Sequence, residues 1–489
     1  MTRIIDFLYN NIKNSPDKIA VYCEDKEITY KDFGLLVNKF SNMLLAQGVK
    51  HLDNIGVLLP NNIDFIALIF AAANIGAAIT PLSPTLPESA ILQLFDYADV
   101  KHVVGTNATL SNVDISKFNA KIITDSDDFK NSSEKEVICE EVKGDEPLIF
   151  TMTSGSTGNP KPIVLSQKNK VDRAFSAINM YKVTKDDVVL AATPLYHSLA
   201  ERLVIIPLIL GATSVLMPRF SPLTWLNTVK DRAVTFTIAV SSQLRQISEV
   251  LTSPYLPEIG SLRCIASSSA LLEDHSKREL IDKLKCDFHE NYGTSEIACA
   301  TNIDMTTSRH KMKSVGKAFP DVDVKILRKD NTFAPVGEVG EIVVKTPLLF
   351  MGYYKIPEKT KSSLFGEYFK TGDLGKMDED GYLYFIDREK DLIISGGINV
   401  YPKDIEEVVS KYDSIIECAA FPYPDSNLGE VVALALVVKD DFQLRQFKFY
   451  CADNLADFQM PRKYFTLDAL PRNNMGKLAK HKLVEMFVE

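Results

Sequence analysis

The residues with the clearest capacity for chemistry lie in one stretch, residues 151–162, which reads TMTSGSTGNPKP. Its hydroxyl-bearing and glycine residues are Thr153, Ser154, Gly155, Ser156, Thr157 and Gly158, and a positive charge follows at Lys161. Backbone N–H groups and hydroxyls donate hydrogen bonds to phosphate oxygens, while a lysine offsets the phosphate charge. The stretch therefore predicts a phosphate-binding loop, and a flexible Ser/Gly linker is the alternative.

Apolar, β-prone residues flank this loop at residues 148–150 and 163–165, so we expect a strand, the loop and a second strand. The loop is not a Walker A motif, because that motif has its lysine before serine or threonine, whereas Lys161 lies between two prolines. A helix does not readily begin straight after such a Lys-Pro step.

A second candidate is the segment NYGTSE at residues 291–296. The aromatic ring of Tyr292 can cover a purine base, and Ser295 offers a hydroxyl. The carboxylate of Glu296 can hold Mg²⁺ against phosphate oxygens. Taken alone, each residue also fits a structural role, such as a core tyrosine or an acid at a helix N-terminus.

Two further polar stretches lie nearer the C-terminus. Asp373 follows a glycine turn in TGDL, where a carboxylate can accept both hydroxyls of a ribose, and Arg388 comes fifteen residues later. Lys477 lies in the polar segment PRNNMGKL. A turn aspartate and a surface lysine are the structural alternatives, but the joint occurrence of all these motifs favours a nucleotide site.

Length and composition exclude several classes of function. A chain of 489 residues is too long for one core, so at least two domains are expected. The formal net charge of −9 argues against binding to nucleic acid. Seven cysteines without a CxxC pair are typical of a reduced, cytoplasmic chain that has neither a zinc site nor disulfides. The two most apolar stretches, residues 65–87 and 203–218, are broken by proline and glycine, so no membrane insertion is expected.

The elements that must position these residues follow an α/β pattern. Strand–helix alternation through the first 200 residues predicts parallel sheets covered by helices. Residues 106–147 are polar and acidic and are expected to form a solvated surface excursion. Strands dominate residues 315–385, which predicts a β-rich subdomain. A compact α+β pattern follows, so we expect a large N-terminal domain, residues 1–388, and a small mobile C-terminal domain, residues 389–489.

Together these motifs resemble the adenylate-forming superfamily of acyl-CoA synthetases, peptide-synthetase adenylation domains and beetle luciferases, and they are closest in pattern to acyl-CoA synthetases. The resemblance covers essentially the whole chain and includes TSGSTGNPKP, PLYH, NYGTSE, YFKTGDL, DREKDLIISGGINVYPKDIE and PRNNMGKL in this order. It implies an enzyme that converts a carboxylate and ATP to acyl-AMP and pyrophosphate and then passes the acyl group to a thiol. The implied cofactors are ATP, Mg²⁺ and CoA.

The resemblance also implies roles for single residues. It assigns the ATP phosphates to Thr153, Ser154, Thr157 and Lys161, with Gly155, Ser156 and Gly158 in the same loop. It assigns the rest of the nucleotide and the metal to Tyr292 and Gly293 at the adenine, Ser295 at the α-phosphate, Glu296 at Mg²⁺, and Asp373 and Arg388 at the ribose. Because adenylation joins two anions, positioning and charge stabilisation must supply most of the catalysis.

The small domain would alternate between two half-reactions. By resemblance, Lys477 bridges the carboxylate and the α-phosphate during adenylation, and Lys390 lies at the hinge. The pair Gly396 and Gly397 lies where pantetheine passes in the acyl-CoA synthetases. That loop favours CoA as the acceptor.

Two alternatives to the CoA ligase remain open. One is a stand-alone adenylation enzyme that loads the phosphopantetheine thiol of a carrier protein. The other is a non-catalytic binding protein on the same scaffold, which the presence of the expected catalytic residues Lys161, Glu296 and Lys477 disfavours.

The acyl pocket is where the chain departs from the usual pattern. By resemblance the pocket is lined by His197, Ser198, Glu201, Arg202, Ser267, Ser268 and Ser269. One interpretation is that Glu201 and Arg202 face away and pair with neighbours at the domain surface. The other is that one of them meets a polar group on a small or medium-sized acid that carries a hydroxyl, an amine or a second carboxylate.

Overall fold

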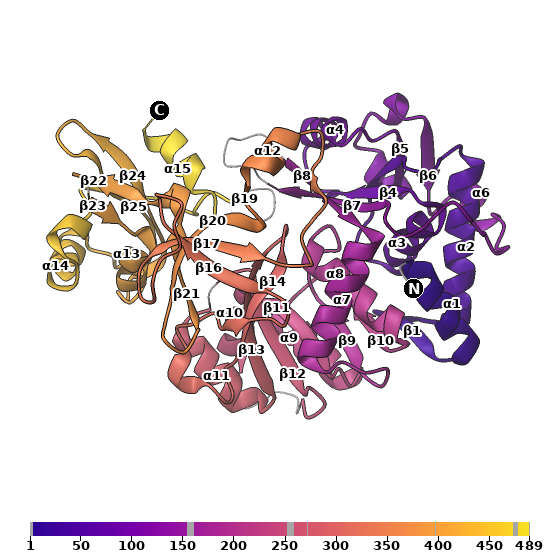
Figure 1. Ribbon diagram of the computed structural model, residues 1–489, viewed down its shortest axis with the longest axis horizontal. Coiled ribbons are helices and arrows are strands. Elements are labelled where there is room, and N and C mark those ends of the chain that lie inside the picture. The colour runs from indigo at the N-terminus through magenta and orange to yellow at the C-terminus, as the bar shows by residue number, and fades with distance from the viewer. Residues whose placement is uncertain are drawn as a thin grey trace. The chain divides into compact units, whose positions relative to one another are not determined.

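The computed structural model of the protein describes residues 3–153, 161–251, 259–270, 272–396, 398–472 and 478–488. The chain divides into two compact units (Figure 1). Unit 1 comprises Met1–Val324 and Val344–Phe369, and unit 2 comprises Lys325–Val343 and Lys370–Glu489. These units describe packing, whereas the domain boundary expected after residue 388 and the hinge near Lys390 concern movement and stay predictions.

A nine-stranded sheet in unit 1 consists of β1 (Ile19–Cys23), β2 (Lys26–Thr29), β9 (Val188–Ala191), β10 (Thr213–Leu216), β11 (Phe236–Val240), β12 (Cys264–Ser268), β13 (Asp287–Thr294), β14 (Ala298–Asp304) and β15 (Lys317–Ala318). Its strand order is β15-β14-β13-β12-β11-β9-β10-β1-β2. The strands from β13 to β1 in this order are parallel to one another, and β2, β14 and β15 pair antiparallel. The predicted parallel α/β architecture is confirmed.

A seven-stranded sheet in unit 1 carries the predicted phosphate loop. It consists of β3 (Asn54–Leu58), β4 (Ala78–Pro81), β5 (His102–Gly105), β6 (Ala120–Ile123), β7 (Pro147–Thr153), β8 (Lys161–Ser166) and β18 (Gly352–Tyr353), in the order β18-β8-β7-β4-β3-β5-β6. Because β7 and β8 are antiparallel neighbours, the two strands expected on either side of the loop are confirmed.

Helices alternate with these strands. They are α1 (Ile4–Asn14), α2 (Tyr30–Ala46), α3 (Ile63–Ile75), α4 (Glu88–Tyr97), α5 (Asn107–Leu110), α6 (Asp127–Lys130), α7 (Gln167–Tyr181), α8 (Ser198–Leu210), α9 (Pro222–Asp231), α10 (Ser241–Val250), α11 (Asp274–Leu284) and α12 (Pro357–Ser362), with short 3₁₀ turns η1 (Ile115–Lys117) and η2 (Arg309–Lys311). None of the described helices of either unit is long and apolar enough to cross a membrane.

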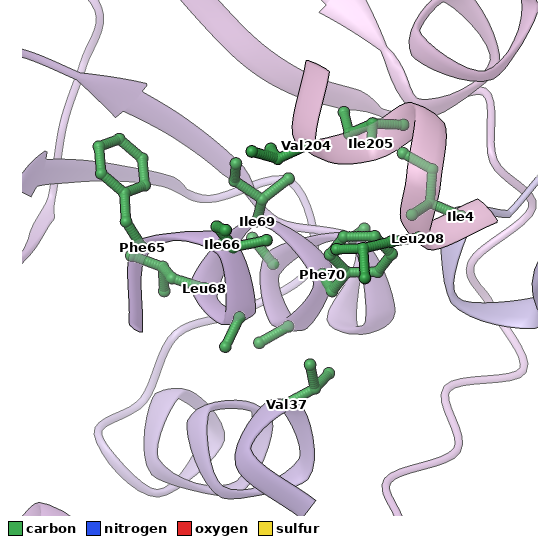
Figure 2. Close-up of a cluster of buried hydrophobic side chains, with 14 of the residues drawn as sticks. Ile4, Val37, Phe65, Ile66, Leu68, Ile69, Phe70, Val204, Ile205 and Leu208 are labelled. Atoms are coloured by element: carbon green, nitrogen blue, oxygen red, sulfur yellow. The ribbon is translucent and has the colours of Figure 1, made fainter. Parts of the chain in front are cut away.

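The core of unit 1 is centred on α3. Its residues 65–75 are all buried, as expected for a helix that is apolar on every side. Figure 2 shows Ile66, Ile69 and Phe70 of this helix between Val37 of α2 and Ile205 and Leu208 of α8. Gly76 ends α3 with a φ of 71°, a left-handed conformation that glycine adopts without steric cost. The buried α3 and α8, each followed by a strand, account for both of the apolar stretches in the sequence.

The expectation of a solvated excursion over residues 106–147 is wrong in part. β6 extends the seven-stranded sheet beside β5 in parallel register. Nearby, α6 buries Phe129 against Phe40 of α2, with ring centroids 4.4 Å apart. A four-residue strand at a sheet edge has only two inward side chains, Ala120 and Ile122, so its apolar signal is weak among polar neighbours.

The remaining strands and helices follow the predicted β-rich and α+β parts. The β-rich part holds β16 (Asp323–Leu327), β17 (Gly340–Lys345), β19 (Leu364–Phe365), β20 (Tyr368–Met377) and β21 (Leu383–Arg388). The α+β part holds η3 (Glu389–Asp391), β22 (Ile393–Ser395), β23 (Ile398–Val400), α13 (Pro402–Val409), β24 (Ile415–Asp425), β25 (Gly429–Val438), α14 (Leu444–Asn454), η4 (Asp457–Gln459), β26 (Lys463–Thr466) and α15 (Lys480–Phe487). Its last sheet has the order β23-β22-β25-β24, with β26 beside β25.

Candidate active site

The topology of unit 1 brings several predicted site residues to one edge of the nine-stranded sheet. His197 follows the parallel strand β9, Ser268 is the last residue of β12, and Tyr292 lies near the end of β13. Ligands of open α/β sheets bind where the parallel strands end. The expected acyl-pocket residues and the expected adenine-binding residue therefore belong to the same edge.

The base of the phosphate loop is the hairpin of β7 and β8, in which Thr153 lies opposite Lys161. Lys161 is half-buried at the first position of β8. The side chain of Thr153 and the loop residues Ser154, Gly155, Ser156, Thr157 and Gly158 lie outside the described part of the chain.

The hairpin of β13 and β14 requires a glycine next to the predicted adenine-binding tyrosine. A Cβ atom at Gly293 would lie 1.7 Å from the carbonyl oxygen of Ala298, so a larger residue does not fit. The register shifts between Tyr292 and Gly293, and such irregularities redirect side chains beside active sites. Tyr292 is mostly buried, with 8% of its surface exposed.

Glu296 is held at both its side chain and its main chain. The hydroxyl of Tyr353 donates a hydrogen bond to Oε1 of Glu296 over 2.9 Å. The backbone N–H of Phe350 donates to the carbonyl of Glu296 over 2.8 Å. Burial, together with the negative charge of Glu296, raises the pKa of Tyr353 well above its ordinary value, so the hydroxyl keeps its proton at neutral pH.

Arg173 on α7 also holds this turn, and it is not among the residues predicted from the sequence. Its Nη1 donates to the carbonyl of Ser295 over 2.9 Å, and its Nη2 donates to the carbonyl of Glu296 over 2.7 Å. Nη2 and Nε also donate to the carbonyl of Leu348 over 2.7 and 3.1 Å. Burial and the like charge of Arg202 lower the pKa of Arg173 to about 9, so the guanidinium stays charged at neutral pH.

A signal for Arg173 is present in the sequence of α7. Lys170, Arg173, Ala174 and Ala177 are buried, and their spacing places them on one face of the helix. Two cations on the buried face of a helix are unusual, because a buried charge requires partners. The partners of Arg173 come from more than 100 residues later, so only the fold identifies them.

Glu201 on α8 is the partner of the second cation. Its Oε2 lies 2.6 Å from Nζ of Lys170, and both side chains are almost fully buried. Burial lowers the pKa of Lys170, and the charge of Glu201 opposes that shift. Glu201 is thus paired, as one of the two interpretations expected, but in the interior of unit 1 and not at its surface. Arg202 is half-buried, and its Nη1 donates to Sγ of Cys299 over 3.2 Å.

The other expected pocket residues differ in their surroundings. His197 is the N-cap residue of α8, and its ring lies edge-on to Tyr196 with centroids 4.6 Å apart. Ser267 is fully buried, and its hydroxyl has no hydrogen-bond partner among the described residues. Ser268 donates to Oδ1 of Asn291 over 2.9 Å. Two more expected pocket residues complete the set: Ser198, which is the first residue of α8, and Ser269, which is exposed.

Unit 2 holds the expected ribose and hinge residues. Asp373 and Arg388 lie opposite each other on β20 and β21, and Nε of Arg388 is 3.3 Å from Oδ1 of Asp373. Asp373 is 3% exposed, so its carboxylate is shielded from solvent. Lys390 is exposed in η3. Gly396 has a φ of 57°, and its N–H donates to the carbonyl of Leu428.

Lys477 and Gly397 lie outside the described residues. The described residues on either side of the segment that carries Lys477 pair with each other within unit 2. Arg472 and Leu478 form an antiparallel bridge there, and the N–H of Ala479 donates to the carbonyl of Pro471 over 2.9 Å.

Comparison with known proteins gives two family matches and close structural relatives. Residues 8–354 match the family described as "AMP-binding enzyme", and residues 404–477 match "AMP-binding enzyme C-terminal domain". A 2-succinylbenzoate–CoA ligase of Bacillus mycoides is 28% identical over 478 residues, which are 97% of each chain. The long-chain-fatty-acid–CoA ligase FadD13 of Mycobacterium tuberculosis is 29% identical over 489 residues, which are 96% of each chain.

Among solved structures, the O-succinylbenzoate coenzyme A synthetase (MenE) of Bacillus subtilis in complex with ATP and magnesium ion has a TM-score of 0.89. The two proteins are 27% identical, and the match covers 98% of each chain. The two family models together span the phosphate-loop hairpin, the Tyr292–Glu296 turn and the segment that ends at Lys477. The chain therefore belongs to the AMP-binding enzyme family.

Proposed function

We propose that the protein is an ATP-dependent carboxylate–CoA ligase. It converts a carboxylic acid and ATP to acyl-AMP and pyrophosphate and then transfers the acyl group to the thiol of CoA. The observation that carries the proposal is the edge of the nine-stranded sheet, where Tyr292 lies near the end of β13, Glu296 follows that strand and Ser268 ends β12. Two relatives, the 2-succinylbenzoate–CoA ligase and the long-chain-fatty-acid–CoA ligase, are named as CoA ligases, and this supports CoA as the acceptor.

Unit 1 supplies the groups that bind ATP. The loop from Thr153 to Gly158, with Lys161, binds the phosphates, and Ser295 contacts the α-phosphate. Glu296 fits Mg²⁺, because a carboxylate oxygen is a ligand that this ion prefers and Oε2 of Glu296 has no hydrogen-bond partner among the described residues. Bound Mg²⁺ offsets the charge of the phosphate oxygens.

Unit 2 supplies the residues that bind the ribose and, in residues 389–489, the groups that change between the half-reactions. Asp373 accepts hydrogen bonds from the ribose hydroxyls, and Arg388 lies beside it. Lys477 stabilises the charge that develops when the carboxylate attacks the α-phosphate. Rotation about Lys390 then replaces Lys477 with the pair Gly396 and Gly397, where pantetheine reaches the acyl group.

The acid that we propose is small or medium-sized and carries a second polar group. Ser267 supports this, because its buried hydroxyl lacks a partner among the described residues and such a group is costly to leave unsatisfied. His197, Ser198 and Arg202 line the same pocket in this proposal. Glu201 does not contact the acid in this proposal, because its carboxylate is paired with Lys170 inside unit 1.

We place the reaction in the cytoplasm. All seven cysteines are free thiols, as in reduced compartments.

The experiment is a measurement of pyrophosphate release across a panel of acids, with CoA or a holo-carrier protein as the acceptor. The panel contains 2-succinylbenzoate, short dicarboxylates, hydroxy acids, amino acids and long-chain fatty acids. We expect release with one of the polar acids, and thioester formation with free CoA. A preference for long-chain fatty acids would refute the polar pocket. Thioester formation only with the carrier protein would refute CoA as the acceptor. No pyrophosphate release with any acid would favour a non-catalytic binding protein.

A further inference from the structure

The contact between Tyr353 and Glu296 joins two distant parts of unit 1. Tyr353 belongs to β18, and its hydroxyl lies 2.9 Å from Oε1 of Glu296. An ionised carboxylate has no proton to donate, so the tyrosine is the donor in this bond. The hydroxyl of Tyr353 therefore binds Oε1, which is one of the two carboxylate oxygens of Glu296.

Tyr353 itself is held from several sides. β18 pairs with β8, the strand that begins at the phosphate loop, and places Tyr353 opposite Ile163. The backbone N–H of Tyr353 donates to Oγ1 of Thr360 over 2.9 Å. Its ring meets Phe350 edge-on, with centroids 4.9 Å apart. These contacts restrict both the main chain and the ring, so the hydroxyl has a defined position.

The main chain of Glu296 is fixed by the same segment. Phe350 donates to the carbonyl of Glu296, and Arg173 links that carbonyl to the carbonyl of Leu348. The last torsion of a glutamate side chain is broad, so a fixed main chain does not orient the carboxylate. The hydroxyl of Tyr353 supplies the restraint that the main-chain contacts lack.

We propose that Tyr353 is a positioning residue for Mg²⁺: its hydroxyl holds Oε1 of Glu296 and leaves Oε2 for the metal. This inference rests on the proposed role of Glu296 in the CoA ligase. It also couples the metal ligand to β8, because Tyr353 and Lys161 lie on neighbouring strands. Hydrogen-bond partners of metal ligands commonly change metal affinity by about 10- to 100-fold when they are removed.

The chain offers a matched control at the next residue. Tyr354 also donates its hydroxyl to a carboxylate, Oδ2 of Asp99, over 2.7 Å. Its ring also meets a phenylalanine edge-on, Phe150, with centroids 4.9 Å apart. Tyr353→Phe and Tyr354→Phe therefore each remove one hydroxyl and one hydrogen bond to an acid, but only the first contacts Glu296.

The experiment measures Mn²⁺ binding to the full chain by electron paramagnetic resonance, with α,β-methylene-ATP as a nucleotide that cannot be adenylated. Mn²⁺ takes oxygen ligands as Mg²⁺ does. For Tyr353→Phe we expect the Mn²⁺ Kd to rise by about 10-fold or more, and for Tyr354→Phe we expect the parent value. An unchanged Kd in Tyr353→Phe overturns the inference.

A third variant separates this inference from the proposed function. Glu296→Gln should weaken Mn²⁺ binding at least as much as Tyr353→Phe. If Glu296→Gln weakens binding and Tyr353→Phe does not, the inference fails and the metal role of Glu296 stands. If Glu296→Gln keeps the parent Kd, Glu296 does not hold the metal and the proposed metal site falls together with the inference. A thermal unfolding scan of each variant verifies that the folded protein is compared in every case.

Discussion

At the scale of single residues, the turn before β14 depends on one guanidinium. Arg173 donates hydrogen bonds to three carbonyls, those of Ser295, Glu296 and Leu348. Arg173→Met removes these donors but keeps an unbranched apolar chain. An acceptor left unsatisfied in the interior costs about 1–3 kcal/mol. We therefore expect a lower free energy of unfolding in urea and a slower ATP–pyrophosphate exchange.

Gln167→Leu is a control on the same helix. Gln167 is buried and donates to the carbonyl of Ala73 over 2.9 Å, on the side of α7 toward α3. This variant should lose stability and keep the exchange rate of its folded fraction. The ATP–pyrophosphate exchange rates of the two variants are compared under conditions in which both are fully folded. If the rates are equal, Arg173 has no role in the site.

Single residues also differ in how far their roles can be predicted from the sequence. Glu296 and Asp373 lie in motifs whose hydroxyls, glycines and aromatic residues point together to a nucleotide. Lys170, Arg173 and Glu201 lie in helices whose composition is ordinary. Their roles depend on partners that only the folded chain brings within hydrogen-bond distance. The interior position of Glu201 was missed for this reason, since spacing shows which residues share a face and not what covers it.

At the scale of elements, the β13–β14 hairpin sets the distance between Tyr292, the proposed adenine-binding residue, and Glu296, the proposed metal ligand. Gly293→Ala would place a Cβ atom 1.7 Å from the carbonyl oxygen of Ala298, so the two strands must separate. Tyr292 and Glu296 lie on either side of this point, and a shift of about 1 Å in such residues can cost about 10²-fold in rate. We expect ATP–pyrophosphate exchange to fall by that order. Gly260→Ala is the control, because a Cβ atom there meets nothing within 4 Å in the described part of the chain. A parent-like rate in Gly293→Ala would contradict the tight fit.

The opposite edge of the same sheet contains a charged network with a defined pH dependence. Asp187 accepts from Nε and Nη2 of Arg263 over 2.8 and 2.9 Å, from Oγ1 of Thr235 over 2.6 Å and from the N–H of Thr184 over 2.7 Å. Burial alone would raise the pKa of Asp187, but these donors hold it below its ordinary value. The network therefore adds stability above the ordinary aspartate pKa, and this stability is lost as the pH falls through the lowered pKa.

Asp187→Asn tests that network. Hydrogen bonds to a charged group contribute about 1.5–3 kcal/mol, so the variant should be less stable than the parent by that amount at about pH 7. The difference should shrink as the pH falls through the lowered pKa of Asp187, where the parent carboxylate takes up a proton. Urea unfolding over a descending series of pH values measures it. A difference that stays constant with pH would show that the charge of Asp187 does not act in this way.

Elements with strong local patterns were predictable, and one without them was not. The apolar runs over residues 65–87 and 203–218 identify the regions of α3 and α8 in the sequence. β6 has four residues at a sheet edge and lies among acidic residues, so its pairing with β5 becomes visible only when the sheet is assembled.

At the scale of the whole molecule, the proposed function requires the small domain to move between two half-reactions. Lys390→Pro fixes φ at the proposed hinge. We expect it to retain acyl-AMP formation and to lose most thioester formation from supplied acyl-AMP, because hinges act through large φ and ψ changes at a few residues. Single-turnover measurements of both half-reactions, with Lys390→Ala as the control for the lost charge, test this. Thioester formation at the parent rate in Lys390→Pro would place the hinge elsewhere.

The proposed reaction, in which the carboxylate attacks the α-phosphate of ATP and a thiol then takes the acyl group, has a direct isotopic test. The acid with the highest pyrophosphate release is labelled with ¹⁸O in its carboxylate and incubated with ATP, Mg²⁺ and CoA, and the products are analysed by mass spectrometry. Attack of a carboxylate oxygen on the α-phosphorus leaves that oxygen on the phosphate when the thiol attacks the acyl carbon. We expect AMP that carries a single ¹⁸O atom for each thioester formed. Label in orthophosphate, or AMP without label, would contradict it.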